Sequence, residues 1–158
     1  MCGIVGALGN NKACNKSIEE MANTLKHRGP DDFGIWSDTK NNIFLAHRRL
    51  SILDLSNNGH QPMISESERY IVVFNGEIYN HIHLREKYFK GYRWKSTSDT
   101  ETLLQAIEIW GLDKTLEKVN GMFSFAAWDR KKKCLYLARD RFGEKPLYYG
   151  WIPQNKSF

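Results

Sequence analysis

The segment that most constrains the fold is residues 122–128 (MFSFAAW), because this almost wholly apolar run predicts a strand buried on both of its faces. A second apolar segment follows at residues 134–139. The basic run at residues 130–133 between them has the position and composition of a hairpin turn, so the two segments are predicted to pair. A strand that is covered on both faces belongs inside a layered domain.

Two helices are predicted by apolar spacing. The first carries an apolar stripe at i, i+3, i+4 and i+7 that begins at Ile18, and it must stop near His27, because a Gly-Pro pair follows. The second begins behind Ser98, which has the capping-box spacing to Glu101, and it ends at Gly111.

Three further strands are predicted at residues 2–8, 43–53 and 70–74, and the first of them is expected to be buried. Hairpin-linked strands with segregated helices indicate an α+β layered domain rather than alternating βαβ units. The chain contains no internal repeat, low-complexity tract or Gly/Ser linker, so we expect one domain over residues 1–158.

Composition excludes several classes of protein. Hydrophobic residues make up 41% of the chain and charged residues 26%, which argues against disorder, collagen and coiled coil. No apolar run approaches the roughly 18 residues of a membrane span, and the first residues lack the charged region of a signal peptide, so a cytoplasmic location is expected. The three cysteines, Cys2, Cys14 and Cys134, are too few and too scattered for a disulfide scaffold or a zinc knuckle.

The formal net charge of +5 comes wholly from the second half of the chain. Residues 1–79 carry 8 basic and 9 acidic groups, whereas residues 80–158 carry 15 basic and 9 acidic groups. A nucleic-acid interface needs basic residues gathered on one face among aromatic residues, and here they are spread. A solvated basic surface is therefore the preferred interpretation, with a nucleic-acid-binding module as an alternative.

Cys2 directly follows the initiator methionine, so it becomes the N-terminal residue once an aminopeptidase removes Met1. A free α-amine has a pKa of about 7.7–8.0 and a thiol one of about 8.5, so the amine can accept the thiol proton without a histidine. The structural alternative is a small residue buried at the start of a strand. If Met1 is retained, the nitrogen of Cys2 is an amide and the base is missing.

Polar residues at three other places could serve the same site. Arg49 belongs to a polar run that interrupts an apolar strand, and its planar guanidinium can hold a carboxylate through two parallel hydrogen bonds. Asn75 and Gly76 offer a side-chain amide and a backbone N–H, the donors of an oxyanion hole, although an Asn-Gly pair alone is more typical of a turn. Asp99 follows the Ser98 cap, where helix-dipole stabilisation also explains an acid.

Nine short blocks, in order over about residues 2–150, resemble the glutamine-hydrolysing half of asparagine synthetases. Any one block could arise by chance, whereas the ordered set is specific. The blocks are residues 1–6 (MCGIVG), 27–32 (HRGPDD), 46–52 (AHRRLSI), 61–63 (QPM), 75–80 (NGEIYN), 98–101 (SDTE), 121–126 (GMFSFA), 138–143 (ARDRFG) and 145–149 (KPLYY).

The resemblance implies a class II glutamine amidotransferase (glutaminase) domain with the four-layer α/β/β/α sandwich of the N-terminal-nucleophile hydrolase type. It implies Cys2 as the nucleophile and Asn75 and Gly76 as the oxyanion hole. It also implies a set of residues that binds glutamine. Arg49 would hold the α-carboxylate with help from Leu50 and Ile52, and Glu77 and Asp99 would bind the α-ammonium.

The implied activity is hydrolysis of L-glutamine through a γ-glutamyl thioester to glutamate and ammonia. The ammonia would go to an ATP-activated aspartate on a C-terminal synthetase domain, which is absent from these residues. No cofactor is expected for the glutaminase domain, whereas ATP and Mg²⁺ would act on the synthetase domain. No nucleic-acid or membrane partner is expected, and a homodimer is left open.

Two alternatives stay open at this point, besides the nucleic-acid-binding module. A related amidotransferase would send ammonia to another acceptor, such as a sugar, and a binding or regulatory domain would keep the fold without catalysis. The five histidines could suggest a metal site. His81 and His83 are two residues apart, however, and no cysteine or aspartate pattern completes a ligand set, so no metal is expected. His27 and His47 are predicted to be structural hydrogen-bonding residues.

Overall fold

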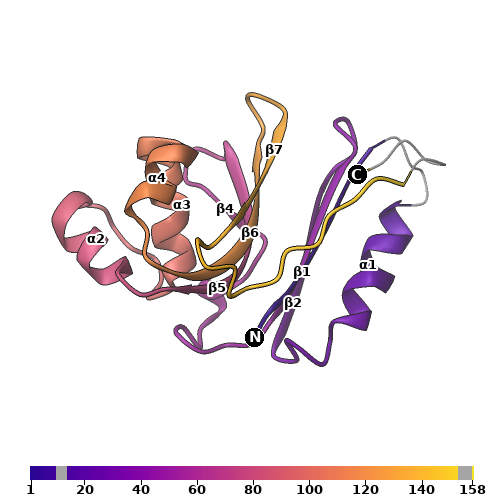
Figure 1. Ribbon diagram of the computed structural model, residues 1–158, viewed down its shortest axis with the longest axis horizontal. Coiled ribbons are helices and arrows are strands. Elements are labelled where there is room, and N and C mark those ends of the chain that lie inside the picture. The colour runs from indigo at the N-terminus through magenta and orange to yellow at the C-terminus, as the bar shows by residue number, and fades with distance from the viewer. Residues whose placement is uncertain (10–13, 153–157) are drawn as a thin grey trace.

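The computed structural model describes residues 1–9, 14–152 and 158, and it contains two antiparallel sheets that face each other (Figure 1). One sheet has the order β1-β3-β2 and the other the order β4-β5-β6-β7. The strands are β1 (Gly3–Leu8), β2 (Asp32–Asp38), β3 (Ile43–Arg49), β4 (Met63–Ile64), β5 (Tyr70–Ile78), β6 (Gly121–Asp129) and β7 (Cys134–Arg139).

Helices cover the outer faces of both sheets, so the prediction of a mixed fold with hairpin-linked antiparallel strands is confirmed. The helices are α1 (Cys14–Thr24), α2 (His81–Tyr88), α3 (Asp99–Trp110) and α4 (Leu112–Lys118), and a short 3-10 helix, η1 (Asn57–Gly59), precedes β4. Figure 1 shows α1 on the outer side of the first sheet and α2, α3 and α4 on the outer side of the second.

The alternation of side chains along β3 explains how the layers are held together. Phe44 and Ala46 pack with α1 in one apolar cluster, whereas Ile43 and Leu45 point to the opposite face and pack against the second sheet. The second sheet repeats this arrangement, because Val73 of β5 faces β3 while other residues of β5 and β6 pack under α3. Every residue of β3 is buried as a result.

The strand predictions hold with four corrections. The β6–β7 hairpin forms with Asp129 opposite Cys134, as predicted. The strand predicted at residues 2–8 is confirmed as β1, but it is a half-buried edge strand rather than a buried one. β3 ends at Arg49, short of the predicted residue 53, and β5 continues four residues past Phe74. The strand β2 was not predicted, because its short sequence lacks a clean apolar alternation.

The helix predictions hold with two corrections. In α1, Ile18 is buried but Met21 is 39% exposed, so the apolar stripe is narrower than its spacing indicates. Ser98 does cap α3, accepting the N–H of Thr100, and Gly111 ends the helix. The reciprocal half of the capping box does not form, because the carboxylate of Glu101 accepts the N–H groups of residues 95 and 96 instead.

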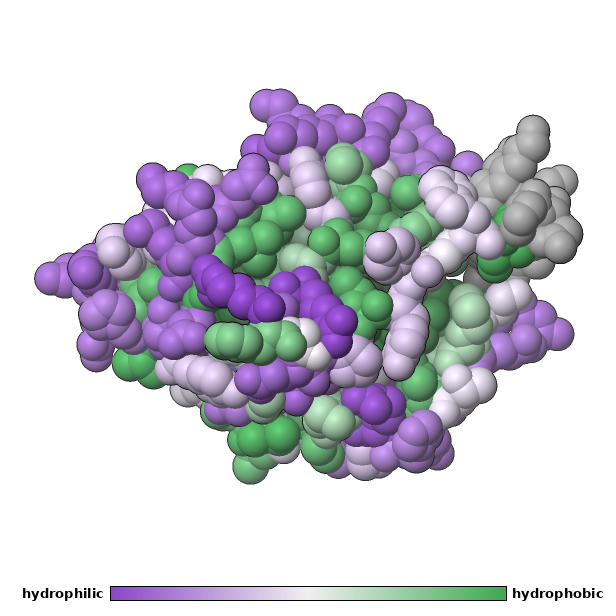
Figure 2. All heavy atoms as spheres, in the orientation of Figure 1, coloured by the Kyte–Doolittle hydropathy of each residue, from purple (hydrophilic) through white to green (hydrophobic). Residues whose placement is uncertain are grey.

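An apolar cavity of about 410 Å³ lies where the two sheets open. Leu45, Val73 and Ala126 reach it from the inner faces of the sheets, and residues 147–150 and Phe158 cover it. Figure 2 shows apolar side chains gathered in this region of the face. The backbone of Phe158 pairs with Leu8 through two hydrogen bonds of 2.7 Å. Over the described ranges, no helix has the length and apolarity needed to span a membrane.

Candidate active site

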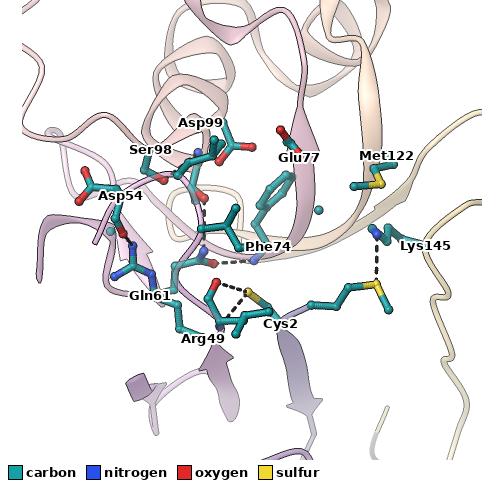
Figure 3. Close-up of a pocket in the computed structure, with 17 residues that line it drawn as sticks. Cys2, Arg49, Asp54, Gln61, Phe74, Glu77, Ser98, Asp99, Met122 and Lys145 are labelled. Atoms are coloured by element: carbon teal, nitrogen blue, oxygen red, sulfur yellow. Dashed lines mark hydrogen bonds between the residues drawn. The ribbon is translucent and has the colours of Figure 1, made fainter. Parts of the chain in front are cut away.

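Seven of the eight predicted site residues line one pocket, although they come from four distant parts of the chain (Figure 3). The pocket lies at the N-terminal end of β1, beside the end of β3, the middle of β5 and the start of α3. The seven residues are Cys2, Arg49, Leu50, Ile52, Gly76, Glu77 and Asp99. The eighth, Asn75, lies on β5 between two residues that line the pocket.

The thiol of Cys2 is held by the backbone of Leu50. The N–H of Leu50 donates to Sγ over 3.4 Å, and Sγ lies 3.7 Å from the carbonyl oxygen of the same residue. Burial raises the pKa of the Cys2 thiol, and the hydrogen bond from Leu50 and the charge of Arg49 oppose this shift only in part. The thiol is therefore mostly protonated at neutral pH and needs a base before it can attack a substrate.

The backbone N–H of Gly76 is directed away from the β5–β6 ladder. Phe123, which lies opposite Gly76, gives its N–H to the Asp140 carboxylate and accepts the Asp140 N–H, both on the β7 side. Gly76 and Phe123 thus form a pair without mutual hydrogen bonds, so the N–H of Gly76 points away from β6.

The two nearest N–H groups on the same edge of β5 as the N–H of Gly76 already have hydrogen-bond partners. The N–H of Phe74 donates to Gln61 over 2.7 Å, and the N–H of Ile78 donates to Asp99 over 2.8 Å. Within the described chain no oxygen takes the N–H of Gly76, which lies between them. The structure therefore presents a free backbone donor at the pocket wall.

Position 76 has room only for glycine. A Cβ there would lie 2.2 Å from the carbonyl oxygen of Met122 and 2.6 Å from Cα of Phe123, so β6 approaches too closely for any side chain. The Asn-Gly pair, which alone is typical of a turn, lies instead inside the continuous strand β5.

The side chain of Asn75 is 4% exposed, and its Oδ1 is buried without a hydrogen-bond partner. Neither end of the amide bonds to another residue in the part of the chain that the structure describes. It lies on the same face of β5 as Val73, between the two sheets. A buried amide oxygen without a hydrogen-bond partner is rare in folded proteins and needs an explanation.

Arg49 lines the pocket and also holds the loop that follows β3. Its Nη1 donates to the carbonyl oxygen of Ser56 over 2.9 Å, and its Nη2 donates to the carbonyl oxygen of Asp54. Two of the five guanidinium N–H groups thus hold the loop after β3, which explains why β3 ends at Arg49 and does not reach the predicted residue 53. The other donors are available to a ligand carboxylate in the pocket.

Two carboxylates stand close together on the opposite wall. Asp99 is the first residue of α3, it is buried, and its Oδ2 accepts the N–H of Ile78. Burial raises the pKa of Asp99 to about 6, and the charge of Glu77 adds to the shift. Glu77 forms no ion pair with the described residues. A ligand ammonium between the two acids would supply the missing positive charge.

Sequence reasoning missed several residues of the pocket, of which Gln61, Gly59 and Lys145 are the most informative. Gln61 links β5 to α3, because its Oε1 accepts the N–H of Phe74 while its Nε2 donates to Thr100 over 3.2 Å. Lys145 is buried and lines the pocket beside Met1. Gln61 and Lys145 lie in blocks that carried the family resemblance, and these blocks were the only sequence signal that could have pointed to them.

The histidines lie outside the pocket lining. His47 and His27 are hydrogen-bonding residues, as predicted: Nε2 of His47 lies 3.0 Å from the carbonyl oxygen of Phe74, and Nδ1 of His27 lies 3.0 Å from that of Thr24. Burial lowers the pKa of His47 to about 4, so it is neutral at physiological pH. Across residues 1–9, 14–152 and 158, no cluster of three or more histidine, cysteine or acidic residues has the arrangement of a metal site.

Comparison with known proteins agrees with this geometry. The family model described as a glutamine amidotransferase domain matches residues 1–158. The chain is similar to the glutamine-hydrolyzing asparagine synthetases 1 and 3 of Bacillus subtilis, with 42% and 37% identity over 96% and 94% of its length. It is 40% identical to asparagine synthetase 2 of Arabidopsis thaliana over 96% of its length. It covers 24%, 25% and 26% of these three relatives, about a quarter of each. The chain belongs to the glutamine amidotransferase domain family.

Proposed function

We propose that this domain hydrolyses L-glutamine to L-glutamate and ammonia, with Cys2 as the nucleophile. The observation that carries the proposal is the free N–H of Gly76 in the same pocket as the Cys2 thiol. A backbone donor that points away from its own ladder is positioned for an oxyanion rather than for the fold. The family match supports the same reaction.

The first step requires removal of Met1, which leaves a free α-amine on Cys2. The α-amine takes the thiol proton, directly or through a water molecule, and the thiolate attacks the side-chain amide carbon of glutamine. A carbon–sulfur bond forms, and the carbonyl electron pair moves onto the oxygen. The N–H of Gly76 and the amide of Asn75 then stabilise this oxyanion.

Collapse of the tetrahedral intermediate breaks the carbon–nitrogen bond. The protonated α-amine gives its proton to the departing nitrogen, which leaves as ammonia, and a γ-glutamyl thioester remains on Cys2. Water then attacks the thioester while the α-amine accepts one of its protons. The sulfur leaves and is reprotonated, which releases glutamate and restores the thiol.

Recognition of glutamine rests on its zwitterionic α-end. Arg49 would hold the α-carboxylate with the donors that the loop leaves available, next to Leu50 and Ile52. Glu77 and Asp99 would bind the α-ammonium from the opposite wall. One cation and two anions at opposite ends of a small pocket fit this substrate class.

We also propose the setting in which the reaction takes place. The ammonia would pass to an ATP-activated aspartate on a C-terminal synthetase domain, and ATP and Mg²⁺ would act there. The relatives are named glutamine-hydrolyzing asparagine synthetases, which supports asparagine synthesis as the setting. The arrangement of helices outside two facing sheets would be the four-layer sandwich of the N-terminal-nucleophile hydrolases. A cytoplasmic location and a possible homodimer belong to the same proposal.

The test is ammonia release from glutamine by protein whose N-terminus is shown by mass spectrometry to be Cys2. Cys2→Ala should abolish release, whereas Cys134→Ala, the matched control on β7, should leave it unchanged. An acid quench during turnover should trap the γ-glutamyl adduct on the peptide that carries Cys2. A Met1-free parent protein that releases no ammonia would instead favour a binding or regulatory domain of the same fold.

A further inference from the structure

Lys145 is a buried cation without an anionic partner. Its side chain is 6% exposed, and it lines the pocket that contains Cys2. Among the described residues no carboxylate forms an ion pair with it, and its Nζ bonds only to the sulfur of Met1, 3.1 Å away (Figure 3). A lysine is rarely buried unless it is paired, so this position needs an explanation.

The backbone holds Lys145 in place. Its N–H donates to Oδ2 of Asp140 over 3.0 Å, and the same carboxylate binds the N–H of Phe123 on β6. Its carbonyl oxygen accepts Nε of Arg139 over 2.6 Å. The turn after β7 is thus tied to both neighbouring strands, and it delivers the ammonium to the pocket as a fixed charge.

Removal of Met1, which the proposed function requires, changes the surroundings of this charge. Nζ loses its sulfur partner, and a new α-amine appears on Cys2 at the peptide bond that held Met1. The Nζ of Lys145 and the new α-amine then lie at the two ends of the space that the Met1 side chain filled, in the pocket that both residues line. A positive charge near an amine disfavours protonation of that amine.

We propose that Lys145 is a positioning residue whose fixed charge keeps the α-amine of mature Cys2 unprotonated, so that the amine can act as the base at neutral pH. Lys145 acts through the α-amine and does not touch the reacting atoms. A free α-amine at its ordinary pKa of about 7.7–8.0 would be largely protonated at neutral pH, so a nearby cation increases the active fraction.

Other charges around Cys2 act on the same α-amine. Arg28, in the turn after α1, donates its Nε–H to the carbonyl oxygen of Cys2 over 3.1 Å, and its charge adds to the effect of Lys145. Arg49 is bound to the loop after β3. Asp99 and Glu77 on the opposite wall favour protonation of the Cys2 α-amine, but the α-ammonium of bound glutamine would neutralise their charges.

The test is a pH titration of the Cys2 α-amine in Met1-free protein labelled with ¹³C-cysteine. The ¹³Cα signal of Cys2 is identified by its absence in Cys2→Ala. Neutral substitution in Lys145→Met should raise the titration midpoint by about half a pH unit or more, and Lys145→Arg should restore it. Lys114→Met removes an exposed lysine on α4 and should leave the midpoint unchanged.

The midpoint of the acid limb in the pH profile of kcat/KM for glutamine should rise in Lys145→Met, return to the parent value in Lys145→Arg and stay unchanged in Lys114→Met. Equal midpoints in the parent protein and Lys145→Met would overturn the proposal, and so would equal shifts in the methionine and arginine variants. Lys145→Gln serves as the neutral variant if the methionine variant does not fold. A shifted midpoint in protein without glutaminase activity would keep this inference and reject the proposed function.

Discussion

Gly59 lies directly against the guanidinium of Arg49: a Cβ at position 59 would be 1.9 Å from Nη2. The absence of a side chain at Gly59 therefore leaves room for the arginine, which already holds the carbonyl groups of Asp54 and Ser56. A buried glycine in η1 thus accommodates the cation that would bind the substrate carboxylate.

Gly59→Ala should therefore raise KM for glutamine about tenfold with little change in kcat, because a displaced guanidinium weakens binding of ground state and transition state alike. We expect it also to reduce the free energy of unfolding by about 1–3 kcal/mol, as overpacking does. Gly150→Ala is the matched control, since no atom lies within 4 Å of a Cβ there. Equal KM values for both variants would contradict the assignment of Arg49.

Asn75→Ala should lower kcat for glutamine by about 10²–10³ while KM stays within a few-fold, because the amide acts on the oxyanion and not on the bound substrate. Steady-state kinetics separates the two constants. Ser124→Ala is the control, because Ser124 lies directly opposite Asn75 on β6 and its buried hydroxyl has no hydrogen-bond partner among the described residues. Loss of activity in the serine variant would point to a packing effect.

Binding of glutamine should weaken in acid. The substrate ammonium needs an ionised Asp99, whose pKa is about 6, so below this pH the carboxyl is protonated and KM should rise about tenfold per pH unit. Asp99→Asn should have a higher KM that stays flat across the same range. A parent KM that is independent of pH between 5 and 7 would exclude this role.

The ionised carboxylate of Asp140 should stabilise the folded protein at pH values above the acid range. Burial alone would raise the pKa of Asp140, but N–H groups of Lys145, Glu144, Phe123 and Phe142 bind its carboxylate and bring the pKa below its usual value. Because the folded-state pKa is depressed, this stability is present above about pH 4 and is lost as the pH falls through the folded-state pKa. Asp140→Asn should therefore unfold more easily than the parent in urea at pH 7, by about 1–3 kcal/mol. The difference should shrink toward pH 3.

The parts of the fold that follow from local periodicity could be predicted from the sequence. The β6–β7 hairpin is an example, since its apolar runs and its turn are contiguous in the chain. β2 could not be predicted, because a short strand with acids at both ends acquires its conformation from its pairing with β3. The extension of β5 past Phe74 has the same cause: Ile78 pairs with Gly121 of β6.

The site was predicted in its residue types but not in its geometry. The charge types and the family resemblance identify Arg49, Glu77 and Asp99 from the sequence. The contacts of Arg49 with the loop after β3 could not be predicted, because they depend on carbonyl groups that follow later in the chain. That Gly76 has a free N–H follows from the register with β6, which no local pattern contains. Lys145 is buried only because the turn after β7 returns to Met1.

In the proposed mechanism, the Met1–Cys2 peptide bond separates folding from catalytic competence. The pocket is already assembled with Met1 in place, so spectroscopic or thermal measures of folding will not distinguish competent molecules from latent ones. One hydrolytic event per molecule, carried out by another enzyme, would set the number of working sites in any preparation. Turnover rates for this protein should accordingly be normalised to the number of free Cys2 amines rather than to protein concentration.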